Sequence, residues 1–182
     1  VVTEVTVKIL KTPEVVRAAL IGFPTIKEGG DAASEILSSG IVPAGMEIMD
    51  KALIEATDNF SKAGYPRDAE LLLIVELDGT DSEVNELIKK VEAICKKNNC
   101  SSLKLSNSEK ERLSFWAGRK AAFPACGAMA PDYYCMDGSI PRGKLTEALL
   151  EIKKLSEKYK LPVANCFHAG DGNLHPLIMF DG

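Results

Sequence analysis

The chain contains only two histidines, and they lie seven residues apart in one short stretch near its C-terminal end. The stretch reads Phe167-His168-Ala169-Gly170-Asp171-Gly172-Asn173-Leu174-His175-Pro176. In one continuous strand, an odd separation would place the two imidazoles on opposite faces. An Asp-Gly pair between apolar runs is a strong signal of a tight turn, because glycine adopts a positive φ without steric cost. We therefore expect the chain to reverse here and the two imidazoles to converge.

Converging neutral imidazoles suit a divalent metal such as Zn, Mn, Fe or Co. A catalytic zinc site typically has three protein ligands and one open position, so His168 and His175 need a further ligand. Two plainer interpretations stand beside this one. The stretch can be a hairpin whose histidines have no role, or a turn whose Asp171 and Asn173 only shape the backbone, since both residue types are common in turns. Spacing alone does not decide among them.

Apolar residues at helical spacing predict the helices that must position this stretch. The first is expected from an Asp50 cap to a stop at Gly64, and the second from a capping box at Thr80. The third is expected to begin at Ser108 and to carry Phe115, Trp116 and Arg119. The remaining two expected helices run through Leu145–Leu155 and, despite the Gly29-Gly30 pair, through Ile26–Leu37.

Strands are expected between these helices. Alternation predicts a half-buried strand over Val1–Ile9, and a second apolar run covers Val15–Phe23. Leu71–Leu77 is continuously apolar, as in the centre of a sheet. The other expected strands are Ala44–Ile48, Ser102–Leu105, Tyr133–Met136, Val163–His168 and Leu174–Phe180. No break in composition divides the 182 residues, so we expect one α/β or α+β domain.

Composition excludes several classes of protein. The formal net charge of −4 counts against a general nucleic-acid binder, which carries a basic surface. No apolar run approaches the roughly 18 residues of a transmembrane segment. The five cysteines are odd in number and contain no Cys-x-x-Cys pair, so we expect free, buried thiols in a reducing compartment, Cys135 among them.

The stretch from His168 to Pro176 resembles the signature of the C-terminal domain of FAD-linked oxidases, in the vanillyl-alcohol-oxidase flavoprotein superfamily. More narrowly, it is similar to the glycolate oxidase D subunit and to D-lactate dehydrogenases. Further segments agree in the same order, so the resemblance covers nearly the whole chain. These segments are Val1–Glu4, Met46–Asp50, Glu76–Gly79, Phe115–Pro124 and Asp132–Gly138.

The resemblance implies an α+β fold, in which helices pack on an antiparallel sheet to form a ferredoxin-like cap domain. Residues 1–182 would be a single substrate-binding domain fragment of a longer protein. An FAD-binding domain is expected upstream of this fragment. A Glu-His-Gly segment is expected downstream, where its Glu would be the third metal ligand and its His the base.

The resemblance also implies a function: the substrate- and metal-binding part of an FAD-dependent 2-hydroxy-acid dehydrogenase that oxidises glycolate or D-lactate to the 2-oxo acid. His168 and His175 would hold a divalent metal, and Arg119 would bind the substrate carboxylate. Asp171 and Asn173 would belong to the active-site loop. FAD would be bound mainly by the other domain. No catalytic residue is expected within this fragment, which we expect to be inactive and colourless alone.

Other interpretations and partners remain open at this point. The chain could be a stand-alone ferredoxin-like ligand-binding or regulatory module, or a metallohydrolase that uses Asp171 as a third ligand. Without the resemblance, Arg119 would be read as an ordinary ion-paired helix arginine. The resemblance further implies partner subunits, including an iron–sulfur subunit. It also implies a cytoplasmic location or a peripheral one on the inner face of a membrane.

Overall fold

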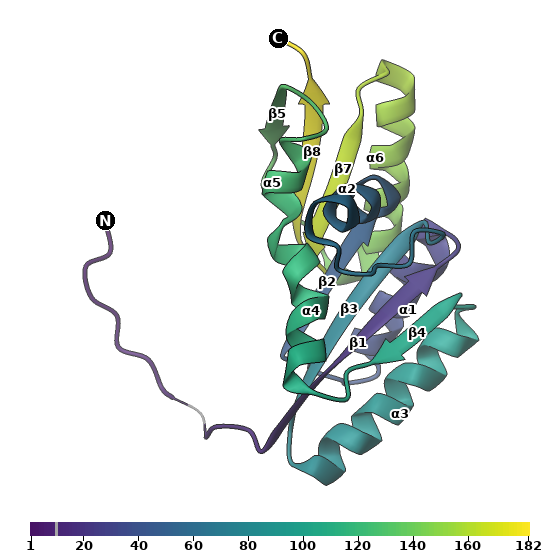
Figure 1. Ribbon diagram of the computed structural model, residues 1–182. Helices are drawn as coiled ribbons and strands as arrows, with labels where there is room; N and C mark the ends of the chain where they lie inside the picture. The colour runs from purple at the N-terminus through teal and green to yellow at the C-terminus, as the bar shows by residue number, and fades with distance from the viewer. Residues whose placement is uncertain (10) are drawn as a thin grey trace.

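A computed structural model describes residues 1–9 and 11–182 of the chain. An antiparallel sheet runs through the molecule in the order β4-β1-β3-β2-β7-β8-β5, with the short β6 paired to β8 (Figure 1). The strands are β1 (Val15–Phe23), β2 (Gly45–Asp50), β3 (Leu71–Gly79), β4 (Ser102–Leu105), β5 (Asp132–Cys135), β6 (Gly138–Ser139), β7 (Val163–His168) and β8 (Asn173–Phe180). This arrangement confirms the expected α+β fold.

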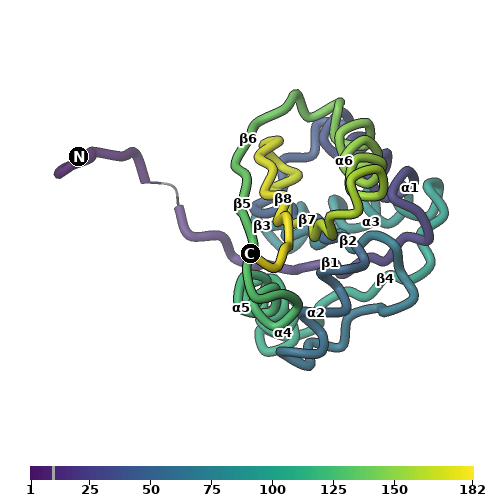
Figure 2. Tube along the Cα trace, turned by 90° about the horizontal axis from the view of Figure 1, so that it is seen from above, coloured from purple at the N-terminus to yellow at the C-terminus, as the bar shows by residue number. Residues whose placement is uncertain are grey.

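Helices cover both faces of the sheet (Figure 2). One face carries α1 (Ile26–Ser38), α3 (Asp81–Lys97) and α6 (Leu145–Tyr159), which follows a short 3₁₀ turn at Arg142–Lys144. The other face carries α2 (Lys51–Ser61), α4 (Glu109–Lys120) and α5 (Ala122–Cys126). The strand order β4-β1-β3-β2, with α1 and α3 on one face, is the ferredoxin-like arrangement. The hairpin of β7 and β8 extends the sheet beyond β2.

Strand β3 shows why two helical layers form. Leu71, Leu73 and Val75 pack into one core, whereas Leu72 and Ile74 pack into the other. Successive strand side chains point to opposite faces, so a continuous apolar run needs cover on both sides. The prediction of a central strand at Leu71–Leu77 is confirmed.

Helix caps agree with the sequence at most positions. Thr80 and Glu83 form the predicted capping box of α3, and Asp50 accepts a hydrogen bond from the Leu53 amide at the start of α2. The Gly64 stop is wrong, because α2 ends at Ser61 and Lys62 adopts the left-handed conformation. Helix α1 contains two glycines where its backbone lies close to neighbouring residues, Leu71 at Gly29 and Thr146 at Gly30. A methyl group at Gly29 would lie 2.1 Å from the Leu71 side chain.

The expected strand over Val1–Ile9 is wrong. These residues are exposed and pair with no strand among the described residues, and Figure 1 shows them running away from the body of the molecule. An alternating pattern predicts which side chains share a face, but a strand also needs a neighbour to hydrogen-bond. Helix α5 and the short β6 were not predicted, because each is too short to show a period.

Asp50 joins two parts of the fold. Besides capping α2, its carboxylate accepts hydrogen bonds from the backbone amide and the side-chain amide of Asn165 in β7, at 2.9 and 2.7 Å. Burial nevertheless raises the pKa of the Asp50 carboxyl to about 6. The folded chain therefore favours the protonated form. The raised pKa of Asp50 stabilises the fold fully below pH 3.8, the ordinary pKa of the group. This stabilisation is lost as the pH rises through about 6.

The substitution Asp50→Asn removes this titration. We expect the free energy of unfolding of the variant, relative to the unmodified chain, to rise by up to about 3 kcal/mol between pH 3.5 and 7. Urea unfolding across this pH range measures the difference. Asp68→Asn, at an exposed position, is the control and should show no such trend. A constant difference for Asp50→Asn would show that Asp50 titrates normally.

Candidate functional site

The chain reverses between β7 and β8, as predicted. Gly172 adopts a φ of +82°, and its amide donates to the carbonyl of His168 at 3.0 Å. A methyl group at Gly172 would lie 2.3 Å from the carbonyl oxygen of Ile140, so both the conformation and the available space require glycine. The reversal fixes the register in which His168 pairs with Asn173 and Cys166 pairs with His175.

This register places the two histidines diagonally on one face of the sheet. Their ring centroids lie 5.2 Å apart, with the ring planes perpendicular. The side chain of His175 is 18% exposed and that of His168 is 39% exposed. Nδ1 of His175 lies 3.7 Å from the carboxylate of the exposed Asp137. The imidazoles therefore converge as expected, in a position that a small molecule can reach.

Glu47 of β2 completes the arrangement. It pairs with His168 across the two strands, and its Oε1 lies 2.6 Å from Nδ1 of that histidine. Its Oε2 accepts a hydrogen bond from Nε of Arg119 at 2.9 Å. The Glu47 and Arg119 side chains are almost fully buried, at 11% and 12% exposed. One carboxylate thus connects the predicted substrate-binding residue to a predicted metal ligand.

Glu47 was not predicted as a site residue from the sequence. The available signal was a charged residue inside the strand sequence Gly45-Met46-Glu47-Ile48-Met49, where both neighbours are apolar and buried. A carboxylate in such a position needs a cationic or hydrogen-bonding partner. The identity of that partner depends on strand order, which periodicity does not reveal.

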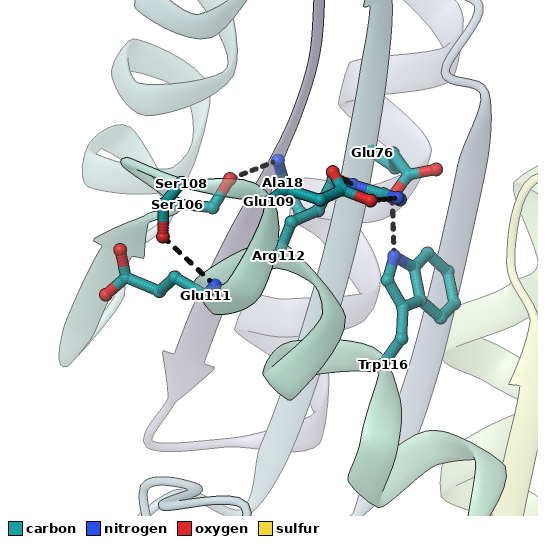
Figure 3. A network of polar contacts seen from close by, with 8 residues as sticks. All are labelled: Ala18, Glu76, Ser106, Ser108, Glu109, Glu111, Arg112 and Trp116. Carbon is teal, nitrogen blue, oxygen red and sulfur yellow. Dashed lines mark hydrogen bonds and ion pairs between the residues drawn. The ribbon is translucent and has the colours of Figure 1, made fainter.

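Helix α4 carries Arg119 and is held against the sheet by a polar network (Figure 3). Oε2 of Glu76 in β3 accepts hydrogen bonds from Arg112 and from the indole of Trp116, each at 2.6 Å. Trp116 also packs against Gly45, where a methyl group would lie 3.2 Å from the indole ring. Ser108 caps the helix by accepting from the Glu111 amide. These contacts fix the direction from which Arg119 approaches Glu47.

Asp171 and Asn173 lie in and beside the turn. Oδ1 of Asp171 accepts the Asn173 amide at 3.0 Å, so this carboxylate supports the turn, and its residue is exposed. Oδ1 of Asn173 is buried and receives no hydrogen bond from residues 1–9 or 11–182. A buried acceptor without a donor is costly, so this oxygen is available to a bound group.

A cavity of about 480 Å³ opens beside His168. Glu47, Arg142 and Asp171 line it together with the loop before β2. Arg142, which was not predicted as a site residue, brings a second guanidinium to the cavity beside His168, and its Nη1 lies 3.4 Å from the carbonyl oxygen of Gly170. Arg119 is not among the lining residues and reaches the site from the other side of Glu47.

The cysteines do not add a ligand. All five are free, as predicted, but the expectation that they are buried is wrong for Cys135, which is exposed, and for Cys100, which is half-buried. Cys166 is the one paired with His175 in the sheet. Burial raises the pKa of the Cys166 thiol to about 12, so the free thiol is protonated at neutral pH. Within the described part of the chain, no three His, Cys, Asp or Glu side chains gather in a way that could hold a metal ion.

The residues present fit part of a metal site. Two imidazoles on one face, beside a buried oxygen without a donor, match the donor types that Zn, Mn and Fe accept.

Within the same described ranges, no helix has both the length and the apolar character needed to cross a membrane.

Comparison with solved structures shows the same fold in a larger enzyme. A structure of alkyldihydroxyacetonephosphate synthase matches 92% of this chain and 36% of its own chain, with a TM-score of 0.64 and 14% identity. The model of one family, described as FAD linked oxidases, C-terminal domain, matches residues 12–182. The chain belongs to this family.

Relatives of known name point in the same direction. The glycolate oxidase subunit GlcD of Escherichia coli strain K12 is 51% identical over 181 residues, which is all of this chain and 36% of that protein. The mitochondrial D-lactate dehydrogenase [cytochrome] of Arabidopsis thaliana is 33% identical over 183 residues, again all of this chain and 32% of that protein. The chain thus spans about a third of the relatives it matches. These matches do not favour a stand-alone regulatory module.

Gly118 sets how closely α4 approaches its neighbour. A methyl group there would lie 2.5 Å from the Tyr65 ring, whose hydroxyl donates to the Phe115 carbonyl. Gly→Ala in a helix normally stabilises, by about 1 kcal/mol. We expect Gly118→Ala to destabilise instead, by about 1–3 kcal/mol, because α4 must shift. Urea unfolding measures the effect.

Gly127→Ala is the matched control for this experiment. Gly127 has a φ of −61°, and a methyl group there would make only ordinary contacts of 3.4 Å or more. We expect no loss of stability for this variant. A Gly118→Ala chain as stable as the unmodified chain would show that the Tyr65 contact does not set the position of α4.

Proposed function

We propose that this chain is the substrate- and metal-binding domain of an FAD-dependent 2-hydroxy-acid dehydrogenase that oxidises glycolate or D-lactate to the 2-oxo acid. The observation that carries the proposal is that Glu47 contacts both Arg119 and His168, with His175 beside His168, in a chain 51% identical to GlcD. The activity of a whole relative is carried over here as a proposal, because the chain matches only about a third of it.

Arg119 binds the substrate carboxylate in this proposal. Glu47 occupies its Nε, and within the described ranges neither of its terminal amino groups pairs with a carboxylate. Two N–H groups in one plane suit a carboxylate, which they can bind with two parallel hydrogen bonds. Arg142, across the cavity, would favour the entry of an anionic substrate.

His168 and His175 would hold a divalent cation such as Zn, Mn or Fe, with further ligands from outside this chain. When bound, such a cation acts as a Lewis acid that lowers the pKa of the substrate hydroxyl. FAD, held mainly by another domain, would accept the hydride. The residues of this chain then bind and orient the acid, while Asp171 and Asn173 hold the loop between the two histidines.

Assembly and location are also part of the proposal. An FAD-binding domain would pack against this one, and a Glu-His-Gly segment would supply a third ligand and a base. Other oxidase subunits, including an iron–sulfur subunit, and a cytoplasmic site or one peripheral to the inner face of a membrane follow from the family resemblance and stay predictions.

A chimera tests the proposed function directly. The segment of E. coli GlcD that matches this chain is replaced by residues 1–182, which leaves that protein's remaining segments in place. We expect glycolate or D-lactate to reduce the flavin of the chimera, as followed by its absorbance without oxygen. Acetate, which lacks the hydroxyl, is the control ligand. A folded, flavin-containing chimera that neither acid reduces would contradict the proposal.

The isolated chain gives a second prediction. We expect residues 1–182 alone to be colourless and without dehydrogenase activity, because the flavin-binding part and the base are expected elsewhere. The absorbance spectrum of the purified chain and an assay with added FAD check this. Stoichiometric flavin absorbance would show that this domain binds FAD by itself.

Arg119 gives a further prediction. In the chimera, Arg119→Ala should raise the KM for the acid about 10- to 100-fold, because a charge-assisted hydrogen-bonded contact of about 1.5–3 kcal/mol is lost. Lys120→Ala, which removes an exposed cation from the next position of α4, is the control and should leave KM unchanged. Equal KM values for both variants would remove Arg119 from the substrate site.

A further inference from the structure

Glu47 makes two short contacts, and together they determine which atom donates the hydrogen in each. Oε2 accepts from Nε of Arg119 at 2.9 Å, and Oε1 lies 2.6 Å from Nδ1 of His168. An arginine guanidinium is always protonated in proteins and has no acceptor atom. Oε2 is therefore committed as an acceptor in the ion pair with Arg119.

An ionised carboxylate can only accept hydrogen bonds, so the contact at Oε1 requires a proton on Nδ1 of His168. In the neutral imidazole, the other nitrogen, Nε2, then carries the lone pair. We propose that Glu47 is a positioning residue that fixes His168 as the Nδ1–H tautomer and so presents the free electron pair of Nε2 to a ligand beside His175.

The surroundings favour this assignment over a purely structural ion pair. Glu47 lies in the middle of the sheet between β3 and β7, so the strand pairing fixes the position of its backbone. The side chain is almost fully buried, and each oxygen has a different partner. A carboxylate that accepts from the far nitrogen of a histidine also makes that histidine a more basic ligand.

The same carboxylate positions Arg119. Since Nε donates to Glu47, the guanidinium plane is restricted relative to His168, and neither terminal amino group pairs with a carboxylate of the described residues. One residue of β2 therefore couples the orientation of the proposed carboxylate-binding group to the orientation of the proposed metal ligand. This coupling rests on the proposed function, whereas the tautomer of His168 does not.

Nitrogen-15 NMR of the histidine rings in the 182-residue chain tests the tautomer without substrate, flavin or metal. The spectra are recorded at a pH high enough that the ring nitrogen-15 shifts no longer change with pH. His175→Gln leaves His168 as the only histidine and assigns its signals. We expect the protonated-nitrogen shift at Nδ1 and the unprotonated shift at Nε2. The reverse pattern in this chain overturns the proposal, whether or not any Glu47 variant folds.

Glu47→Gln should reverse the tautomer. Arg119 continues to donate, so the amide oxygen must face it, and the amide NH₂ then donates to Nδ1 of His168. The ring proton moves to Nε2. Glu76→Gln is the matched control. Glu76 lies on the neighbouring strand β3 and is also paired with an arginine, Arg112 of α4, but it does not contact a histidine. It should leave the His168 spectrum unchanged.

Each result has a defined meaning. A Glu47→Gln chain that keeps the Nδ1–H form, or a Glu76→Gln chain that changes as much, overturns the role of Glu47. Zn²⁺ titration of the same chains adds a separate readout, in which Glu47→Gln should weaken binding about 10- to 100-fold. The two proposals can fail separately. If the tautomer behaves as expected but the chimera with the GlcD remainder takes up no Zn²⁺, the metal part of the proposed function fails. The tautomer assignment then stands.

Discussion

The antiparallel pairing of β2 with β7 is the constraint on which the site depends. It joins the ferredoxin-like part of the sheet to the hairpin formed by β7 and β8. Three residue pairs make this junction, and one of them sets Glu47 opposite His168. Because side chains alternate along a strand, a shift of one residue in this pairing would turn Glu47 toward the helices of the opposite face. Packing of Ile48 and Phe167 in one core, and of Met49 and Cys166 in the other, holds the register.

The second constraint is that polar and charged side chains are held between the sheet and α4. One hydrogen-bonded network consists of Glu47, Arg119 and His168. A second network, on the adjacent strand, consists of Glu76, Arg112 and Trp116. Both networks connect the sheet to α4. A helix that packed only through Phe115 could slide along the apolar face, whereas two directed polar contacts fix its position. The helix is held in place by the same kind of interaction that orients the reactive groups.

Much of this could be predicted from local patterns. The caps of α2, α3 and α4, the central position of β3 and the reversal at Gly172 each depend on residues close together in the sequence. Glu47 and Arg142 could not be found in this way, because their relation to His168 depends on contacts more than twenty residues away in sequence. The strand expected at Val1–Ile9 failed for the same reason. Alternation is local, but a hydrogen-bonded neighbour is not.

The two outer strands of the sheet have a consequence for how the molecule behaves in solution. Strands β4 and β5 are only four residues long, and each has exposed polar side chains, including Lys104 and Asp132. Unpaired backbone at the margin of a sheet is a template on which another chain can add a strand, and short margins with charges resist this addition. A continuous sheet with a strongly apolar centre therefore ends on both sides in segments poorly suited to seeding aggregation.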